Sequence, residues 1–305
     1  MLLKQLSYLI ALARERHFGR AAEACKVSQP TLSTAIRELE SELGVPIVMR
    51  GRRFERLTPE GERVLAWAAR ILADRDSLVQ DLSDMRGSLH GHLRISVVPT
   101  ALPVIARLTA PFNERHPHVT VTATVASSVS IQRGLDNFEL DLGVTYLDNE
   151  PIRHVRSFPL YRERYCLLVP RRAAEAKELR ITWHDAAKQE LCLLTPDMQN
   201  RRIVDAAFRA AGAEPNTRVE TNSITGLILH VQGGQLASVV PRHFLMAPGL
   251  PEGVRALDLV EPELSHLVGV VVADREPLAP TAKAMLGIVK ALSKRDLFAP
   301  DDSVT

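Results

Sequence analysis

A set of polar residues between positions 28 and 37 has the types and the spacing needed to contact DNA bases. These residues would share one face of a helix, and they are Gln29, Pro30, Thr31, Ser33, Thr34 and Arg37. A glutamine can bind an adenine edge through two hydrogen bonds, and a proline ring or threonine methyl group can touch a thymine methyl group. Arg37 is better placed for a phosphate. We therefore predict a helix that reads the major groove, against the plainer alternative of a solvated helix face.

Four arginines follow closely after this helix. Arg50, Arg52, Arg53 and Arg56 surround Gly51, and the β-prone residues before them predict a strand, a turn and a second strand. Arginines at the tip of such a wing suit the negative potential of a narrow minor groove. Residues 1–56 carry ten Lys or Arg and six Asp or Glu, a net charge of +4, whereas the rest of the chain has a net charge of −2. This asymmetry favours a DNA contact over a solvated basic patch.

Three short helices are expected to position these groups. Apolar residues at helical spacing predict helices over residues 2–15 and 19–25. Ser28 suits the N-cap of the third helix, Pro30 its first turn, and Gly44 its end. The core-facing stripe of that helix consists of Leu32, Ile36, Leu39 and Leu43. Together these elements form a predicted helix-turn-helix domain.

A long helix is predicted next, capped by Thr58 and weakened at Gly61. Its apolar positions step by three and four residues and are broken once by arginine: Val64, Ala68, Ile71, Arg75, Leu78, Leu82 and Met85. Thirty residues span roughly 45 Å, and such a helix has no partner within its own domain. We predict that residues 58–88 pair with the same helix of a second chain. The alternative is packing against the carboxy-terminal domain of the same chain.

These stretches carry a resemblance. The run VSQPTLSTAIRELESELGVPIVMRGRR, followed by LTPEG, resembles the amino-terminal signature of LysR-type transcriptional regulators. The resemblance is strong over residues 1 to about 88. It implies base or backbone contacts by Gln29, Pro30, Ser33, Thr34, Arg50 and Arg53, and dimers of dimers that bend DNA. Two departures concern Thr34, where many relatives carry arginine, and Val48-Met49, where many carry Leu-Phe.

The rest of the chain alternates predicted strands and helices, which indicates an α/β fold. Val155–Leu160 and Tyr165–Val169 are expected to be two separate strands. The family resemblance continues in the order of elements, with 91–100 and 135–144 as the closest stretches. It implies a periplasmic-binding-protein-like domain of two lobes. The complete prediction is an amino-terminal all-α winged helix-turn-helix domain (1–58), a dimerisation helix (59–88) and an effector-binding domain (89–305). Lobe I comprises about 91–162 and 268–305, and lobe II about 163–267.

Several hydroxyl and amide side chains fall at predicted strand ends and helix starts, where ligands bind in such folds. They are Thr100, Ser127, Ser128, Thr145, Thr195 and Asn222. Hydroxyl groups and helix N-termini favour an anion, so we expect a small carboxylate near Thr100 and Ser128. Each residue alone could equally be a helix cap. Arg201, Arg202 and His230 are weaker candidates.

The run RFERLTPEGERVLAWA is similar to a LysR-type subgroup that is associated with formate dehydrogenase genes. This resemblance suggests formate as the carboxylate, although three serines and a threonine would suit many small polar ligands.

Other patterns exclude several classes of function. Cys25, Cys166 and Cys192 are unclustered, which predicts neither a disulfide framework nor zinc and favours a cytoplasmic protein. The His pairs at 90/92 and 116/118 lack further ligands at metal-binding spacing, so no metal or cofactor is expected. No hydrophobic run reaches the length of a membrane span. No catalytic motif is present, so we do not expect an enzyme.

The sequence therefore predicts a ligand-responsive transcription regulator that forms homodimers and, as the family implies, homotetramers. Two alternatives stay open at this point. One is a cytosolic small-molecule binding protein or enzyme with a basic head, and the other is a DNA-compacting protein without sequence preference.

Overall fold

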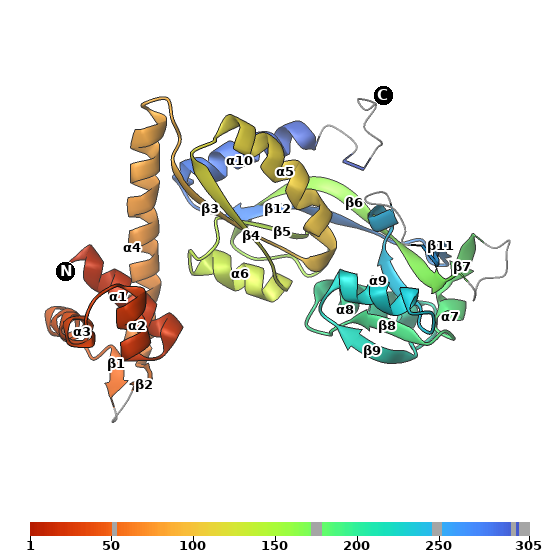
Figure 1. Ribbon diagram of the computed structural model, residues 1–305, viewed down its shortest axis with the longest axis horizontal. Helices are drawn as coiled ribbons and strands as arrows, with labels where there is room; N and C mark the ends of the chain where they lie inside the picture. Colours follow the sequence, from red (N-terminus) through yellow and green to blue (C-terminus); the bar gives the residue numbers. More distant parts are fainter. Residues whose placement is uncertain (51–53, 172–178, 246–251, 294–296, 299–305) are drawn as a thin grey trace. The chain divides into compact units, whose positions relative to one another are not determined.

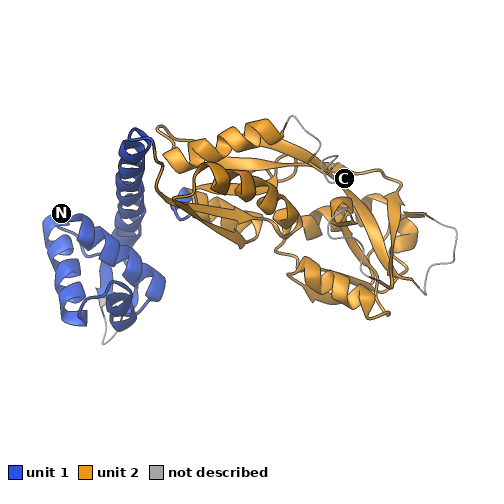
Figure 2. Cartoon of the chain, turned by 45° about the horizontal axis from the view of Figure 1, so that its top comes forward, with its two compact units in different colours: residues 1–87, 136–139 blue, residues 88–135, 140–305 orange. Residues whose placement is uncertain are grey.

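Two units make up the chain in a computed structural model, which describes all residues except 51–53, 172–178, 246–251, 294–296 and 299–305. The first unit contains Met1–Gly87 and Asp136–Glu139, and the second contains Ser88–Leu135 and Leu140–Thr305 (Figure 2).

The first unit begins with three helices around a small core. They are α1 (Leu3–Glu15), α2 (Phe18–Ala24) and α3 (Gln29–Leu43), followed by the hairpin β1 (Val48–Arg50) and β2 (Phe54–Leu57) and the long helix α4 (Pro59–Asp84). The core includes Leu6, Leu9, Leu12, Ala21, Ala22, Leu32, Ile36 and Leu39, all almost completely buried. The expected helix-turn-helix and wing are therefore present, with the polar side of α3 left on the surface.

Helix caps explain where α2 and α3 begin and end. His17 caps α2, because its Nδ1 atom accepts from the backbone N–H groups of Gly19 and Arg20. Ser28 caps α3 as predicted, since its Oγ atom accepts from the N–H of Thr31 at 3.3 Å. Gly44 ends α3 with a φ of 68°, a conformation that glycine adopts without steric cost.

Gly61 proves necessary and does not weaken α4 as we had expected. A Cβ atom at this position would lie 2.1 Å from the carbonyl oxygen of Ile47. The N–H of Gly61 donates to the cap Thr58 at 2.8 Å, and the Thr58 hydroxyl donates to the Pro46 carbonyl at 2.6 Å. The start of α4 therefore docks directly on the segment that leads into the wing.

The two halves of α4 differ in their surroundings. The first half does have partners within its own unit, contrary to prediction, because Ala68 is fully buried and Val64 and Ile71 pack on the core. The second half exposes large apolar side chains, with 58% of Leu78, 49% of Leu82 and 80% of Met85 accessible. This exposed stripe is the part of the predicted heptad seam that remains free to pair.

The second unit is built on one large sheet with the strand order β4-β3-β5-β12-β6-β11-β7, and β10 pairs with β6 outside this order. The strands are β3 (Gly91–Val97), β4 (Val119–Val125), β5 (Leu142–Tyr146), β6 (Val155–Pro170), β7 (Arg180–Thr182), β10 (Ser238–Pro241), β11 (Val254–Val260) and β12 (Ser265–Ala273). A small parallel sheet pairs β8 (Leu191–Leu194) with β9 (Thr217–Thr221).

Helices cover these sheets. They are α5 (Leu102–Arg115), α6 (Ser128–Asp136), α7 (Trp183–Ala186), α8 (Gln199–Ala210), α9 (Ile224–Gln232) and α10 (Pro280–Leu292), with two 3₁₀ helices, η1 (Pro99–Ala101) and η2 (Arg242–Leu245). In Figure 1, α5 and α10 lie on one side of β3, β5 and β12, and α6 lies on the other.

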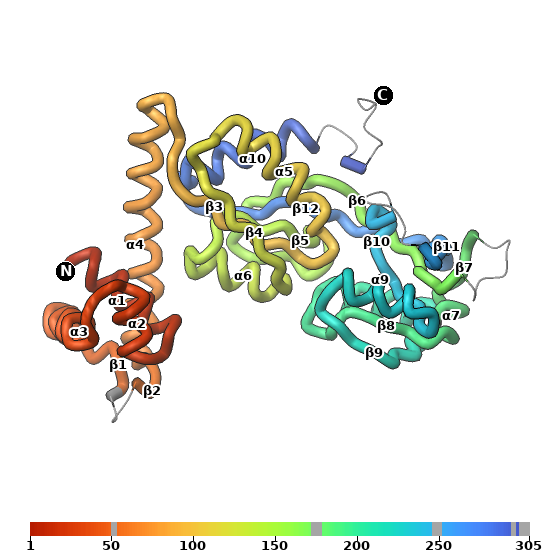
Figure 3. Tube along the Cα trace, in the orientation of Figure 1, coloured from red at the N-terminus to blue at the C-terminus, as the bar shows by residue number. Residues whose placement is uncertain are grey.

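The long strand β6 connects two lobes. It pairs with β12 from Val155 to Arg164 and with β10 and β11 from Tyr165 to Pro170. Figure 3 shows β6 and β12 running between the group formed by β3, β4 and β5 and the group that contains β7 and β11. Our prediction of two separate strands was therefore wrong. The residues between them, such as Glu163, stay in extended pairing because β12 runs alongside as a partner.

Candidate nucleic-acid interface and inter-lobe cleft

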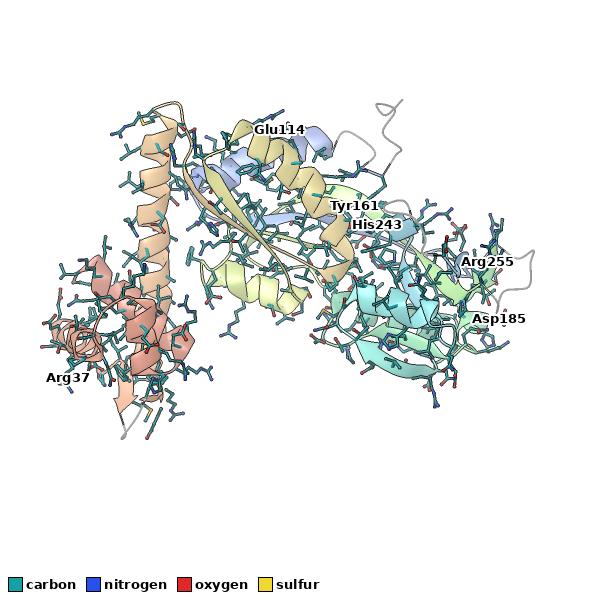
Figure 4. All side chains as sticks on the ribbon, in the orientation of Figure 1. Arg37, Glu114, Tyr161, Asp185, His243 and Arg255 are labelled. Atoms are coloured by element: carbon teal, nitrogen blue, oxygen red, sulfur yellow. The ribbon has the colours of Figure 1, made fainter. Side chains whose placement is uncertain are left out.

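The polar face of α3 is exposed, as a base-contacting surface requires. Gln29, Pro30, Thr31, Thr34 and Arg37 are exposed, and Ser33 is half-buried. Figure 4 labels Arg37 on this helix. Within the part of the chain that the structure describes, the side chains of Gln29, Thr34 and Arg37 form no hydrogen bond or ion pair. Their donors and acceptors therefore remain available for bases and phosphates.

The wing is anchored to α3. A Glu40 carboxylate oxygen accepts from the backbone N–H groups of Ile47 and Val48 at 3.0 and 3.1 Å, which fixes the start of the hairpin. β1 and β2 then pair antiparallel, with Met49 opposite Arg56. Arg52, Arg53 and the side chain of Arg50 lie outside the described residues. The contacts predicted for these three arginines therefore remain predictions from the sequence.

A buried polar cluster lies where the two lobes meet. The Tyr146 hydroxyl donates to the Glu163 carboxylate at 2.5 Å and accepts from the Asn200 amide at 3.1 Å. The Thr100 hydroxyl lies 2.9 Å from the same oxygen. All four side chains are almost completely buried. Thr100 lies between β3 and α5 and Tyr146 lies on β5, whereas Asn200 lies on α8. These hydrogen bonds therefore join the two lobes.

The carboxyl group of Glu163 is the unusual member of this cluster. Burial raises its pKa from 4.5 to about 7, although the neighbouring Tyr146, Tyr165 and Thr100 hydroxyls favour the charged form. One carboxyl oxygen of Glu163 and the hydroxyls of Tyr165 and Tyr161 have no hydrogen-bond partner of normal geometry among the described residues. An anion bound next to Thr100 would lie close to the Glu163 carboxyl group. If Glu163 were charged, the two negative charges would repel each other, so such binding is favoured only when Glu163 is protonated.

Of the six predicted effector residues, two lie in or beside the cluster. Thr100 belongs to it, and the Thr145 hydroxyl donates to the Gln199 side chain at 3.3 Å, again from one lobe to the other. The Thr195 hydroxyl is buried without a partner in the described chain. The other three are placed at helix starts: Ser127 accepts from the N–H of Ser130, Ser128 is buried at the start of α6, and Asn222 is exposed before α9.

Further contacts hold the lobes together around this cluster. The Gln199 amide donates to the Asn149 carbonyl, and Arg202 forms an ion pair with Glu150 at 2.5 Å. Burial lowers the pKa of His243 to about 4, so its neutral ring donates from Nε2 to the Thr100 carbonyl at 2.8 Å. Figure 4 labels His243 beside Tyr161, and their ring centroids lie 5.3 Å apart.

The three weaker candidates have structural roles in this conformation. Arg201 is bound by Asp205, Glu220 and the Leu194 carbonyl. The His230 ring bonds to the Gly226 carbonyl of its own helix, on the surface. Arg202 joins the lobes through its ion pair with Glu150, so its guanidinium group is already bound by the protein.

Sequence reasoning missed Glu163, Tyr165, Asn200 and His243 as members or neighbours of the cluster. The sequence did contain one indication of Glu163 and Tyr165. Tyr161, Glu163, Tyr165 and Leu167 alternate along one strand, so a glutamate shares the face of three buried neighbours. A carboxylate in an otherwise apolar row is a candidate functional group.

The described residues show neither a membrane-spanning helix nor a metal-binding cluster. No helix there is long and apolar enough to cross a membrane. No group of three or more His, Cys, Asp or Glu side chains in the described part of the chain is placed to hold a metal ion.

Comparisons with known proteins agree with this architecture. The profile of the LysR substrate binding domain matches residues 86–294, and the profile of the bacterial regulatory helix-turn-helix protein of the lysR family matches residues 3–62. The hydrogen peroxide-inducible genes activator of Haemophilus influenzae is 28% identical over 283 residues, which cover 91% of this chain and 92% of that protein.

Two further relatives bear the name OxyR. The DNA-binding transcriptional dual regulator OxyR of Escherichia coli is 28% identical over 292 residues, or 95% of each chain. The solved structure of a full-length OxyR variant from Pseudomonas aeruginosa has a TM-score of 0.75 and 25% identity, and the match covers 100% of this chain and 99% of that one. Since the substrate-binding profile alone covers more than half of the sequence, this chain belongs to the LysR family of DNA-binding transcription regulators, which are not enzymes.

Proposed function

We propose that this chain reads a specific DNA site through α3 and the wing, and that a small molecule bound between the lobes controls it. The residues that would contact DNA are Gln29, Pro30, Thr31, Ser33, Thr34, Arg37, Arg50, Arg52 and Arg53. The observation that carries the proposal is the exposed face of α3, on which the side chains of Gln29, Thr34 and Arg37 form no hydrogen bond or ion pair with the described residues. Each function belongs to one domain: residues 1–58 bind DNA, 59–88 dimerise and 89–305 bind the effector.

A variant pair tests this assignment. Gln29→Ala removes a base contact and should weaken binding to the specific site by about 1–3 kcal/mol while relaxing sequence preference. Gln189→Ala, at an exposed position of the second unit, is the matched control and should bind as wild type does. Equal affinities for the two variants in a gel-shift titration would contradict the assignment of α3.

Dimerisation through α4 is the second part of the proposal. Leu78, Leu82 and Met85 form an exposed apolar stripe that a second copy of the helix would cover. Two heads held in this way would occupy a pseudo-palindromic site, and a tetramer would span two such sites. Light scattering of Leu82→Glu should give a smaller particle than wild-type protein.

The effector site is proposed to be the cleft around Thr100, Ser127, Ser128, Thr145, Thr195 and Asn222. A small carboxylate would be bound by these hydroxyls and by the N-terminus of α6 near Ser128. Closure of the lobes on the ligand would shift the population of DNA-binding conformations. The relatives compared above are named for peroxide and not for formate dehydrogenase, so formate is one member of a carboxylate panel.

A thermal-shift screen with that panel tests the effector class. A ligand at 100 times its Kd should stabilise the protein by about 2.7 kcal/mol. Ser128→Ala should lower the shift, whereas Gln189→Ala should leave it unchanged. If neutral or cationic compounds stabilise the wild type and no carboxylate does, the small-acid proposal is wrong.

Peroxide sensing by thiols, which the names of the relatives suggest, is not proposed for this chain. A peroxide-reactive cysteine needs an accessible thiolate of low pKa. Burial raises the pKa of Cys166 to about 12, and burial also raises the pKa of Cys25 and Cys192. We therefore propose an effector that acts by binding.

A further inference from the structure

A strongly charged pocket lies in the second unit, and none of the residues proposed for the effector site lines it. It has a volume of about 330 Å³ and is lined by residues of β6, β7, β11 and η2 and by the segment before β12. Its charged lining residues are Arg164, Arg180, Arg242, Asp258 and Glu263. Tyr165, a neighbour of the buried cluster between the lobes, also lines this pocket. The volume is at the lower end of the range for small-molecule sites.

Strand pairing brings the arginines together. Arg164 on β6 pairs with Ser265 of β12, and Arg180 on β7 pairs with Asp258 of β11. Arg242 follows directly after β10 and forms an ion pair with Asp258. Three guanidinium groups from distant parts of the sequence therefore converge on one polar hollow.

Two of these guanidinium groups are free to bind a ligand. The Arg242–Asp258 pair neutralises one positive charge and holds the Arg242 side chain in place. Arg164 and Arg180 form no hydrogen bond or ion pair with any part of the chain that the structure describes. Because both arginines line one pocket, an anion bound there would reduce the repulsion between their like charges.

Glu263 restricts the kind of anion. Its carboxylate also lines the pocket and forms no hydrogen bond or ion pair with the described residues. It would repel a simple anion but would accept a hydrogen bond from a hydroxyl or ammonium group. The lining therefore suits a molecule with an oxyanion at one end and a donor at the other.

We propose that this pocket binds a small hydroxylated or aminated organic anion, whose carboxylate or phosphate group is held by Arg164 and Arg180 and whose donor group faces Glu263. The site is distinct from the effector cleft. It has a short structural connection to that cleft, because Arg242 is followed by His243, whose ring donates to the Thr100 carbonyl.

Calorimetric titration of the full-length protein at low ionic strength tests the proposal with three probes. L-malate carries carboxylates and a hydroxyl, succinate lacks the hydroxyl, and inorganic phosphate represents phosphate esters. Malate should bind more tightly than succinate, because only malate can donate to Glu263. Tighter binding of phosphate than of malate would identify a phosphate ester as the natural class, and the reverse would identify a hydroxy acid.

Matched variants separate this pocket from general surface charge. Arg164→Ala with Arg180→Ala should lower malate affinity by about a hundredfold, or about tenfold for each guanidinium. Arg218→Ala removes another exposed arginine of the same lobe, paired with Glu190, and should leave binding unchanged. Glu263→Gln should strengthen succinate binding by removing a like charge, and this gain does not depend on the stability of the double variant.

Several results would overturn the proposal. One is the absence of binding of all three probes to wild-type protein, and another is an equal loss of binding in Arg218→Ala. A loss of malate binding in Ser128→Ala would assign the ligand to the cleft. All these outcomes are independent of DNA binding, which the pocket variants should retain.

Discussion

The two units of this chain arrange their recognition groups in opposite ways. On α3, the predicted DNA contacts occupy consecutive turns of one helix, and most of these side chains are exposed. In the buried cluster between the lobes, Thr100, Tyr146, Glu163 and Asn200 come from distant parts of the sequence and are bonded to one another. A surface of the first kind is ready to bind a large partner. A cluster of the second kind joins two lobes through buried hydrogen bonds, and under our proposal a small ligand would act on that junction.

The largest expected effect concerns the buried carboxyl group of the cleft. Folded Glu163 holds its proton to about pH 7, whereas in the unfolded chain it would lose the proton near 4.5. The folded state therefore binds more protons in this window, and its stability should fall by on the order of 3 kcal/mol as the pH rises from 4.5 to 7. Glu163→Gln should lack this dependence and be more stable than wild type at pH 8.

Denaturant unfolding at pH 5 and pH 8 measures this difference. The exposed Glu252→Gln serves as the control and should follow the wild-type curve. If Glu163→Gln kept the full pH dependence of the wild type, the Glu163 carboxyl group would not be the group whose raised pKa causes that dependence.

Two glycines provide the next test. Gly61→Ala places a Cβ atom against the Ile47 carbonyl and should destabilise the first unit by about 1–3 kcal/mol. Gly287→Ala, within α10, meets no atom within 4 Å and should instead stabilise the second unit by about 0.5–1 kcal/mol. Thermal unfolding of both variants would show opposite shifts, and a harmless Gly61→Ala would refute the close docking of α4.

Two serine caps sharpen the contrast between the units. Ser28→Ala should cost about 1 kcal/mol and weaken DNA binding, because Ser28 holds the start of α3. Ser223→Ala removes the equivalent cap of α9 and should have a similar cost without changing DNA affinity. Gel shifts with both variants measure the DNA affinity. An equal loss of affinity in the two variants would contradict the assignment of DNA binding to the first unit.

The smallest expected effect is a null result with peroxide. The three cysteine thiols have raised pKa values, so hydrogen peroxide at levels that oxidise reactive thiolates should leave DNA binding unchanged. A change in binding that disappears in Cys192→Ser or Cys25→Ser would instead indicate redox control in this chain.

Local signals explain why the DNA-binding unit could be predicted so fully. The cap at Ser28, the end at Gly44 and the buried stripe of Leu32, Ile36 and Leu39 all depend on residues within one helix. Gly61 was misjudged because its neighbour Ile47 lies fourteen positions away in the chain, and helix propensity takes no account of such a contact.

The polar cluster between the lobes was predicted only in part, because its contacts depend on pairing between distant strands. Strand ends alone pointed to Thr100 and Thr145, which the structure places in or beside this cluster. Glu163 was missed because it fell between the two strands predicted in place of β6. Pairing with β12 keeps that region extended, and the local sequence does not show this pairing. The arginines of the second pocket also converge through strand pairing, which no local pattern revealed.

Relative affinity for two DNA duplexes tests the central claim most directly. The full-length protein should bind a specific segment of its own upstream region about a thousandfold or more tightly than random duplex at physiological ionic strength. Gln29→Ala should reduce that ratio. Equal affinity for both duplexes would contradict the assignment of α3 as a sequence-reading helix.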